Sequence, residues 1–442
     1  MSHFQLFAVT GNPVLHSKSP GMFNTAFQES NIHACYTRLA ADTAKEAIKT
    51  FRSLGMKGMN VTAPFKEEIM PFLDEIDDSA NFIGAVNTVV NENGKLKGYN
   101  TDWVGVLIPI LNQLQPFDWE THSLNLYKCI IIGASGAGKA AAYGLKTKDA
   151  KITIVNRTIE KAKAVAEKLD CDYAGLEDLS TLIPQADIII IALTQNVNPI
   201  NPAWLSNKHV IFDANYKDSS IIAMAKEKGC TIIDASQWLV VQGIKAYTYF
   251  LGNDPISDSM ISGFSTYNLQ ARCNKIALIG FMGSGKTTVG KKLAKKLNIP
   301  FVDTDDLIVA REGKSIPEIF ELHGEAYFRK CERDVLQSVI DAPGQQIISC
   351  GGGLAINDEN RALLKQYCIV LWLYATPEST IKRINLETRP LLNVENPLEK
   401  AKSLLEQRKQ YYAQASDVII NTEKFDADTI SDKIVDEITR IR

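Results

Sequence analysis

The sequence contains two glycine-rich turns, each between a short apolar run and a helical run, where phosphate groups could bind. The second turn, Gly280-Phe-Met-Gly-Ser-Gly-Lys286-Thr287, has the complete G-x-x-x-x-G-K-[ST] spacing of a P-loop. In such a loop the backbone N–H groups wrap the β-phosphate, the lysine reaches the β- and γ-phosphate oxygens, and the hydroxyl binds Mg²⁺. The sequence therefore predicts a nucleoside triphosphate site. Its predicted contacts are Gly283, Ser284, Gly285, Lys286, Thr287 and Thr288.

The first turn, Gly133-Ala-Ser-Gly136-Ala-Gly-Lys-Ala140, nearly matches the same spacing but has alanine where a P-loop needs a hydroxyl. The alternative is the turn of a dinucleotide-binding Rossmann domain. There Gly133 makes the tight bend, and Gly136 lets the backbone approach a pyrophosphate at the start of a helix.

The strand after this turn indicates which dinucleotide binds. It ends in Asn156-Arg157-Thr158, with Lys161 one turn later, whereas a cofactor without a 2′-phosphate usually meets Asp or Glu there. These groups suit a phosphate dianion, so the position favours NADP over NAD; a solvated charge at a strand end is the other interpretation. Predicted cofactor contacts are Gly133, Ala134, Ser135, Gly136, Ala137, Asn156, Arg157, Thr158 and Lys161.

Polar residues before the first turn could act on a carbonyl group. In His16-Ser-Lys-Ser-Pro20, Ser19 could cap a helix with Pro20 in its first turn, or both serine hydroxyls could face a carboxylate. Lys66 follows a strand end and a Pro-Phe turn, and Asp102 closes the segment Asn100-Thr-Asp. A lysine and an aspartate on adjacent loops can hold and relay a proton at a carbonyl that is being reduced.

Acidic and basic residues after the P-loop could hold its acceptor. Asp303 and Asp305 follow a strand, with side chains on the same face, although they could also cap the next helix. Arg329, Arg389 and Arg408 are far apart in the sequence, and guanidinium forks suit a carboxylate and a transferring phosphoryl group. Each alone is more typical of a solvated helix charge.

Length and composition limit the class of protein. The 442 residues suggest about three domains, and 45% hydrophobic residues are enough for several packed cores. Charges nearly cancel, with 48 Lys and Arg against 51 Asp and Glu, so neither nucleic acid nor a membrane is expected as a partner. No secretory signal is visible, the apolar runs 188–193 and 369–373 are too short to span a bilayer, and the dispersed cysteines suit a reduced, cytoplasmic protein.

Strands and helices alternate along the chain, which predicts parallel sheets covered by helices. The expected fold class is α/β: an N-terminal α/β substrate domain plus a Rossmann NADP domain, followed by a P-loop α/β domain like that of the nucleoside monophosphate kinases. The expected domains are residues 1–103 (completed by about 235–261) for the substrate, 104–234 for NADP, a linker at 262–273, and 274–442 for the P-loop domain.

The motifs HSKSP, NVTAPFK, GAVNT and GYNTD, followed by the glycine turn and NRT, resemble shikimate dehydrogenase over roughly residues 4–260. The resemblance implies that NADPH delivers hydride to the C3 carbonyl of 3-dehydroshikimate, giving shikimate, with Lys66 as proton donor and Asp102 as its partner. The chain departs from the family in Asp213-Ala-Asn-Tyr216, at Ala235 and Gln237, and at Ser135, which weakens the placement of the nicotinamide. The implied substrate contacts are Ser17, Ser19, Thr62, Asn87, Tyr216 and Gln242.

The motifs GFMGSGKT, DTD, IPEIF, GEAYFRKCE, GGG, RPLL and RKQYY resemble shikimate kinase over residues 275–442. The resemblance implies that Thr287 and Asp303 hold Mg²⁺, that Asp305 orients the 3-hydroxyl of shikimate, and that Arg389 rides on a lid over the γ-phosphate of ATP. Arg383 is implied to stack on adenine. The implied shikimate contacts are Asp305, Arg329, Gly351, Gly352, Gly353 and Arg408.

Both resemblances lead to one molecule, because the product of the dehydrogenase is the acceptor of the kinase. The chain is therefore expected to run two successive steps of the shikimate pathway, with 3-dehydroshikimate and shikimate as small-molecule substrates; no protein partner is indicated. Two alternatives remain: a quinate/shikimate dehydrogenase that uses NAD, fused to the kinase, and a sensor that binds the same ligands without turnover.

Overall fold

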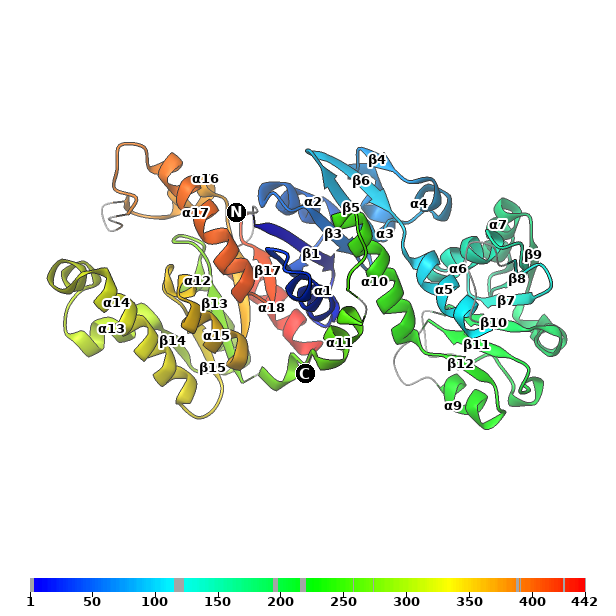
Figure 1. The fold of residues 1–442 in the computed structure, drawn as a ribbon. Coiled ribbons are helices and arrows are strands. Elements are labelled where there is room, and N and C mark those ends of the chain that lie inside the picture. The colour runs from blue at the N-terminus through cyan, green and yellow to red at the C-terminus, as the bar shows by residue number, and fades with distance from the viewer. Residues whose placement is uncertain are drawn as a thin grey trace. The chain divides into compact units, whose positions relative to one another are not determined.

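We describe the protein from a computed structural model, shown as a ribbon in Figure 1. The described residues are 4–114, 123–193, 198–214, 220–256, 258–272, 274–386, 389, 391–423 and 426–441. The chain divides into two compact units. The first joins residues 1–72 to residues 262–442, and the second is residues 73–261.

The second unit contains a six-stranded sheet in which every pair of strands is parallel. Its order is β12-β11-β10-β7-β8-β9, so the chain order reverses between the neighbours β7 and β10. Ligands of open α/β sheets bind at such a switch point. The strands are β7 (Lys128–Ile132), β8 (Lys151–Val155), β9 (Asp172–Ala174), β10 (Ile188–Ile191), β11 (Val210–Asp213) and β12 (Thr231–Ile233).

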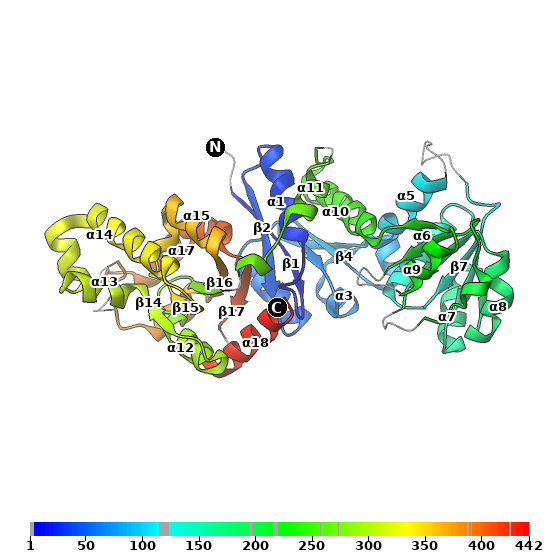
Figure 2. The same cartoon turned by 90° about the horizontal axis from the view of Figure 1, so that it is seen from below.

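Helices cover both faces of this sheet (Figure 2). Alternate residues of β7 point to opposite faces, so that Cys129 and Ile131 join one apolar core while Ile130 and Ile132 join another. Helices α5, α6 and α7 contribute to the first core, and α8 and α9 to the second. The helices of this part are α5 (Asp102–Leu114), α6 (Gly136–Lys146), α7 (Ile159–Leu169), α8 (Leu179–Leu182), α9 (Ser220–Glu227) and α10 (Ala235–Leu251).

The second unit also holds three shorter strands and one helix before α5. β5 (Thr88–Glu92) pairs antiparallel with β6 (Lys95–Tyr99), and β4 (Glu75–Ile76) pairs parallel with β6. Helix α4 (Asp78–Ile83) is preceded by its N-cap residue Asp77, whose carboxylate accepts a hydrogen bond from Ser79 N.

The N-terminal part of the first unit is a parallel sheet. β1 pairs with both β2 and β3, and the strands are almost fully buried. This is why they read as continuous apolar runs. The elements are β1 (Gln5–Gly11), α1 (Ser19–Glu29), β2 (Ala34–Ala40), α2 (Ala44–Ser53), β3 (Gly58–Val61) and α3 (Phe65–Glu68).

The C-terminal part of the first unit has five parallel strands in the order β14-β15-β13-β16-β17. Helix α14 is interrupted at Gly324, where φ is +76°. The elements are β13 (Lys275–Ile279), α12 (Lys286–Leu297), β14 (Phe301–Asp303), α13 (Thr304–Glu312), α14 (Ile316–Asp341), β15 (Gln346–Ser349), α15 (Asp358–Tyr367), β16 (Cys368–Tyr374), α16 (Pro377–Arg383), α17 (Pro397–Ala415), β17 (Val418–Asn421) and α18 (Ala427–Thr439).

The two parts of the first unit share one sheet. β17 pairs in parallel with β2, Ile419 opposite Leu39 and Ile420 opposite Ala40, so the strands run β14-β15-β13-β16-β17-β2-β1-β3. Residues 262–273, expected as a linker, contain the end of α11 (Ser259–Thr266) and a short 3₁₀ turn, and they belong to this unit. Here α11 lies against α1, since a Cβ added to Gly21 would stand 2.6 Å from the Gly263 carbonyl oxygen. The domain borders from the sequence stay predictions.

The predicted α/β class is confirmed, with Rossmann strand order in the second unit and a P-loop strand at the centre of the C-terminal sheet. The apolar runs expected to be strands are the buried β10 and β16. No helix among the described residues is both long and apolar enough to cross a membrane.

Candidate active sites

The P-loop follows β13 and ends where α12 begins, at Lys286. Its glycines have backbone conformations that other residues rarely adopt, with φ of +143° at Gly280, +77° at Gly283 and +91° at Gly285. A Cβ on Gly283 would also lie 2.8 Å from the side chain of Ile384. No side chain caps α12, so its first N–H groups are available to an anion.

The side chain of Lys286 folds back onto this loop. Its ammonium group donates hydrogen bonds to the carbonyl oxygens of Gly280 (2.9 Å) and Phe281 (3.0 Å). Burial disfavours the charged form and lowers the pKa of Lys286 to about 8, although the nearby Asp305 carboxylate acts in the opposite direction. The lysine therefore loses its charge at a lower pH than an exposed lysine does.

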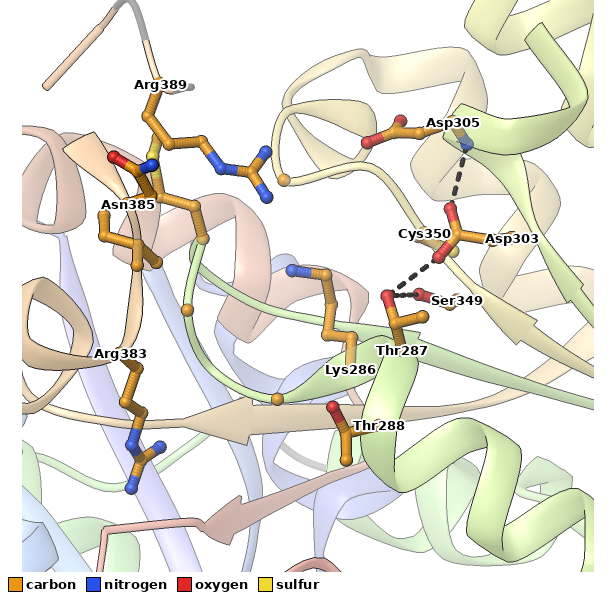
Figure 3. Close-up of a pocket in the computed structure, with 15 residues that line it drawn as sticks. Lys286, Thr287, Thr288, Asp303, Asp305, Ser349, Cys350, Arg383, Asn385 and Arg389 are labelled. Atoms are coloured by element: carbon orange, nitrogen blue, oxygen red, sulfur yellow. Dashed lines mark hydrogen bonds between the residues drawn. The ribbon is translucent and has the colours of Figure 1, made fainter. Parts of the chain in front are cut away.

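Three oxygen-bearing side chains meet beside the loop (Figure 3). The Thr287 hydroxyl donates to Asp303 Oδ2 at 2.9 Å and lies 3.3 Å from the Ser349 hydroxyl. Such oxygen donors suit Mg²⁺, which usually binds one or two carboxylates together with water and phosphate oxygens. No group of three or more His, Cys, Asp or Glu side chains in the described ranges could hold a metal ion.

Asp303 and Asp305 differ in role. The other carboxylate oxygen of Asp303 accepts a hydrogen bond from Asp305 N at 3.1 Å and caps α13, so the capping interpretation is realised as well. Burial raises the pKa of Asp305, and the Asp303 carboxylate adds to this. Within the described part of the chain, Asp305 Oδ1 is buried and accepts no hydrogen bond. An unused acceptor in a pocket suits a ligand hydroxyl.

The triglycine segment 351–353 lies between Asp305 and two arginines. A Cβ on Gly351 would stand 2.5 Å from Asp305 Oδ1, and the Gly353 Cβ position faces the Arg329 guanidinium. The Arg408 guanidinium donates to the Gly352 carbonyl oxygen at 3.3 Å. The structure thus brings all of these predicted shikimate contacts together.

Three partners of these residues were missed in the sequence. Glu332, 1% exposed, pairs with Arg329 at 2.7 Å; Tyr412 donates to the Gly352 carbonyl oxygen at 2.6 Å; and Ser349 contacts Thr287. The i, i+3 spacing of Arg329 and Glu332 could have indicated the first pair. Nothing in the local pattern singles out the other two.

Beside these residues lies a pocket of about 390 Å³, a size suited to a small ligand, whose lining includes Asp305 and Gly352 but neither Arg329 nor Arg408. Arg389 points into the pocket, whereas Arg383 points away from Lys286 and donates to the Thr422 carbonyl oxygen at 2.7 Å (Figure 3). The predicted residues that line the pocket are Gly283, Gly285, Lys286, Thr287, Thr288, Asp303, Asp305, Gly352, Arg383 and Arg389. Ser284, also predicted, is fully buried, and its hydroxyl has no partner among the described residues.

A second polar group in the first unit contains Ser17 and Ser19. Their hydroxyls are 3.2 Å apart, and Ser19 also hydrogen-bonds the Tyr36 hydroxyl, which in turn donates to Asn60 Oδ1 at 2.7 Å. Ser19 begins α1 without capping it, so the capping role expected for Ser19 is wrong, whereas Pro20 does lie in the first turn of the helix as expected. Tyr36 and Asn60 were missed because both lie in buried strands, where they read as core.

Thr62 and Lys66 lie near the same edge of the N-terminal sheet. Thr62 follows β3, and its N–H donates to the Thr10 carbonyl oxygen at 2.9 Å. Lys66 lies in the short helix α3 and is half-buried. The carboxyl ends of β1 and β3 position both residues, as expected for ligand groups on a parallel sheet.

In the second unit, Asn87, Thr101 and Gln242 form one partly buried hydrogen-bond network. Asn87 Nδ2 donates to the Thr101 hydroxyl (3.0 Å) and to Gln242 Oε1 (3.2 Å). Asp102 begins α5 and is 3% exposed, and its N–H donates to Asn100 Oδ1. Thr101 was not predicted by itself, and Tyr216 lies outside the described residues.

The first glycine turn is much shorter than the P-loop. Only Gly133 to Ser135 separate β7 from α6, which begins at Gly136, and Gly133 has φ of +116°. The Ser135 hydroxyl donates to the Ala192 carbonyl oxygen (2.8 Å) after β10, which leaves the start of α6 without a side-chain cap. The turn therefore presents N–H groups at the switch point of the sheet, an arrangement that fits a pyrophosphate.

The predicted 2′-phosphate residues follow β8. The Asn156 side chain accepts from Ala134 N (3.3 Å) and donates to the Thr158 carbonyl oxygen (2.9 Å), so it ties the glycine turn to this loop. Arg157, Thr158 and Lys161 are exposed. They therefore fit a phosphate dianion without first breaking a buried ion pair.

Comparison with known families agrees with both sites. A family model described as shikimate kinase matches residues 282–439, one described as the shikimate dehydrogenase substrate binding domain matches residues 9–89, and one described as shikimate / quinate 5-dehydrogenase matches residues 118–220. Along the chain, the match to the substrate binding domain comes first, the match to the dehydrogenase second and the match to the kinase last.

Individual relatives match the dehydrogenase part. The shikimate dehydrogenases (NADP(+)) of Aquifex aeolicus and Pyrococcus furiosus are 37% and 38% identical, over 56% and 57% of this chain and 91% of each relative. A crystal structure of a shikimate dehydrogenase in complex with NADP⁺ is 31% identical with a TM-score of 0.53, covering 59% of this chain and 94% of that one. The chain therefore belongs to the shikimate dehydrogenase family, and it carries a shikimate kinase domain at residues 282–439.

Proposed function

We propose that the chain reduces 3-dehydroshikimate to shikimate with NADPH and then phosphorylates shikimate to shikimate 3-phosphate with ATP and Mg²⁺. The observation that carries the proposal is the pair of glycine turns of different length. One is a three-residue turn at a Rossmann switch point, and the other is a complete P-loop beside oxygen ligands for Mg²⁺. Both family matches name the same small acid.

In the dehydrogenase reaction NADPH, when bound, supplies the hydride. We assign Ser17 and Ser19 to the substrate carboxylate, and Thr62, Asn87, Tyr216 and Gln242 to the ring substituents, following the family resemblance. The resemblance assigns Lys66 as the donor of a proton to the oxygen of the carbonyl that is reduced, with Asp102 as its partner. The hydrogen bond between the two serine hydroxyls supports their shared role, because it holds them 3.2 Å apart, within reach of one ligand group.

In the kinase reaction, the site residues position the attacking hydroxyl of shikimate and the phosphate of ATP, and they stabilise the negative charge of the transferred phosphoryl group. Asp305 accepts a hydrogen bond from the 3-hydroxyl of shikimate and orients it for attack, while Arg329 and Arg408 bind the acid. Lys286 and Arg389 stabilise the negative charge that spreads over the transferred phosphoryl group. Thr287 and Asp303 would hold Mg²⁺. The raised pKa of Asp305 supports this role, because its proton affinity lies closer to that of the hydroxyl.

The whole sequence of reactions is tested on the purified chain given 3-dehydroshikimate, NADPH, ATP and Mg²⁺. We expect NADPH to be oxidised and shikimate 3-phosphate to form, and mass spectrometry detects this product. Binding without turnover would instead favour the sensor, and faster turnover of quinate with NAD⁺ than of shikimate with NADP⁺ would favour the quinate enzyme.

Lys66→Ala separates the two activities. It should lower the turnover of dehydroshikimate reduction by about 10³-fold, because it removes the proton donor, and leave shikimate phosphorylation by ATP unchanged. The matched control is Lys57→Ala, an exposed lysine before β3, which should change neither activity. If Lys66→Ala impaired both activities equally, the assigned role would be wrong.

Arg157→Ala tests the choice of cofactor. The loss of a charged hydrogen bond to the 2′-phosphate should raise KM for NADPH by about tenfold to a hundredfold and leave KM for NADH unchanged. Lys163→Ala, which removes another exposed charge from α7, is the control and should affect neither constant. Equal effects of Arg157→Ala on both cofactors would show that Arg157 does not contact the 2′-phosphate.

Arg389→Ala tests the stabilisation of the phosphoryl group. Kinase turnover should fall by about a hundredfold or more, while the Kd of shikimate changes by less than about threefold, because the guanidinium acts on charge that develops during transfer. Lys400→Ala, an exposed lysine of α17, serves as control. Unchanged turnover in rapid-quench measurements would refute the role.

The lowered pKa of Lys286 makes ATP binding sensitive to pH. The free enzyme loses the lysine charge above about pH 8, whereas bound phosphates favour the charged form. The Kd of ATP should therefore be constant below about pH 7 and rise by up to about tenfold per unit above pH 8. Lys286→Arg stays charged and should lose this dependence. Parallel profiles for the two proteins, measured by calorimetry, would contradict the assignment.

A further inference from the structure

The loop that carries Ser17 and Ser19 is connected to the opposite end of the chain, directly through the Glu437 side chain and indirectly through Arg38. This loop, residues 14–19, follows β1 and ends at Ser19, the first residue of α1, in the N-terminal part of the first unit. Its direct partners are Glu437 of α18 and Arg38 of β2, and Arg38 in turn contacts Asp417, directly before β17. Glu437 and Asp417 both lie within the part that matches shikimate kinase. The contacts therefore join the proposed dehydrogenase substrate loop to the kinase.

Glu437 of α18 makes the first of these connections. Its carboxylate accepts hydrogen bonds from Val14 N at 2.9 and 3.1 Å and from Leu15 N at 2.7 Å. Glu437 is 2% exposed, and both loop residues are fully buried. Water therefore cannot replace the carboxylate. The carboxylate fixes the backbone at Leu15, two residues before Ser17.

Arg38 of β2 makes the second connection. Its Nε donates to the Ser17 carbonyl oxygen at 3.1 Å, as does its Nη2, and its Nη1 donates to the Asp417 carbonyl oxygen at 2.9 Å. Arg38 is fully buried. The planar guanidinium thus bridges the backbone of Ser17 and the residue that precedes β17, which fixes their separation.

Asp417 is itself rigidly held. Its carboxylate accepts hydrogen bonds from Val370 N (2.8 Å) and Arg272 Nη2 (2.7 Å). The Arg38 guanidinium also lies 5.1 Å from the centre of the Tyr267 ring. The anchor of the Ser17 backbone is therefore part of a buried network and not a mobile surface contact.

We propose that Glu437 and Arg38 are positioning residues of the dehydrogenase: they set the Ser17 and Ser19 hydroxyls for the substrate carboxylate, so that this loop depends on the kinase part of the chain. The inference rests on the proposed function. It goes beyond that function, because it assigns a dehydrogenase role to a residue in the last helix of the kinase. Neither side chain touches the substrate.

The experiment uses Glu437→Gln in the full-length chain, with shikimate as the common substrate of both reactions. With NADP⁺ and no ATP, KM for shikimate should rise about tenfold while kcat changes by less than about threefold, since a carboxylate contact made in both ground and transition state is weakened. With ATP and Mg²⁺ alone, KM for shikimate should stay within about twofold of wild type. Asp436→Asn, an exposed neighbour on the same helix, is the control for charge and should match wild type.

A second comparison isolates the carboxylate. Shikimate methyl ester cannot present the anionic group that the serine hydroxyls bind. The ratio of kcat/KM between wild type and Glu437→Gln, measured with NADP⁺, should therefore fall from about tenfold with shikimate toward one with the ester. An equal ratio for both substrates would indicate a general loss of structure and overturn the proposal.

The remaining outcomes also decide between the hypotheses. If Glu437→Gln does not fold, Arg38→Lys, which keeps the charge but loses the planar fork, is measured in the same way. A variant that matches Asp436→Asn, or that weakens both activities equally, would refute this inference alone. A wild-type chain that does not oxidise shikimate would refute the proposed function, and the inference with it.

Discussion

The pairing of β17 with β2 is the constraint on which the first unit depends. Each of these strands would otherwise be the edge of its own parallel sheet, with unpaired N–H and C=O groups open to association. Their pairing closes both edges at once and places Asp417 beside Arg38. A buried guanidinium needs fixed acceptors, so the register of this strand pair also determines where the Ser17 backbone lies.

The two glycine turns show how similar sequences give different sites. Both begin with a glycine at the end of a central strand and both continue into Gly-Lys, yet α6 begins at Gly136 and α12 only at Lys286. The short turn leaves the N–H groups at the start of α6 without a side-chain cap, which fits a pyrophosphate. The longer loop surrounds its own lysine, where burial lowers the lysine pKa. The residue at which the helix begins, and not the number of glycines, distinguishes the two sites.

Most of the candidate chemistry could be predicted because it is local in sequence. The P-loop occupies eight consecutive positions, and strand ends mark where Asp303 and Gly351 must lie. The α/β class also followed from buried apolar runs such as β10. The contacts of Arg38 and Glu437 could not be predicted in this way, because their partners are 379 and 423 positions away. In sequence they look like one charge in a strand and one on an amphipathic helix.

The same difference explains why the expected linker is not a simple spacer. A polar stretch before a P-loop strand resembles a connection between independent domains. In the structure, however, Arg272 pairs with Asp417, and Gly263 lets α11 approach α1 closely. The segment thus packs against both parts of the sheet that it connects. Since removing either part would expose a strand edge and leave buried charges without partners, the first unit is better understood as one folding unit than as two joined domains.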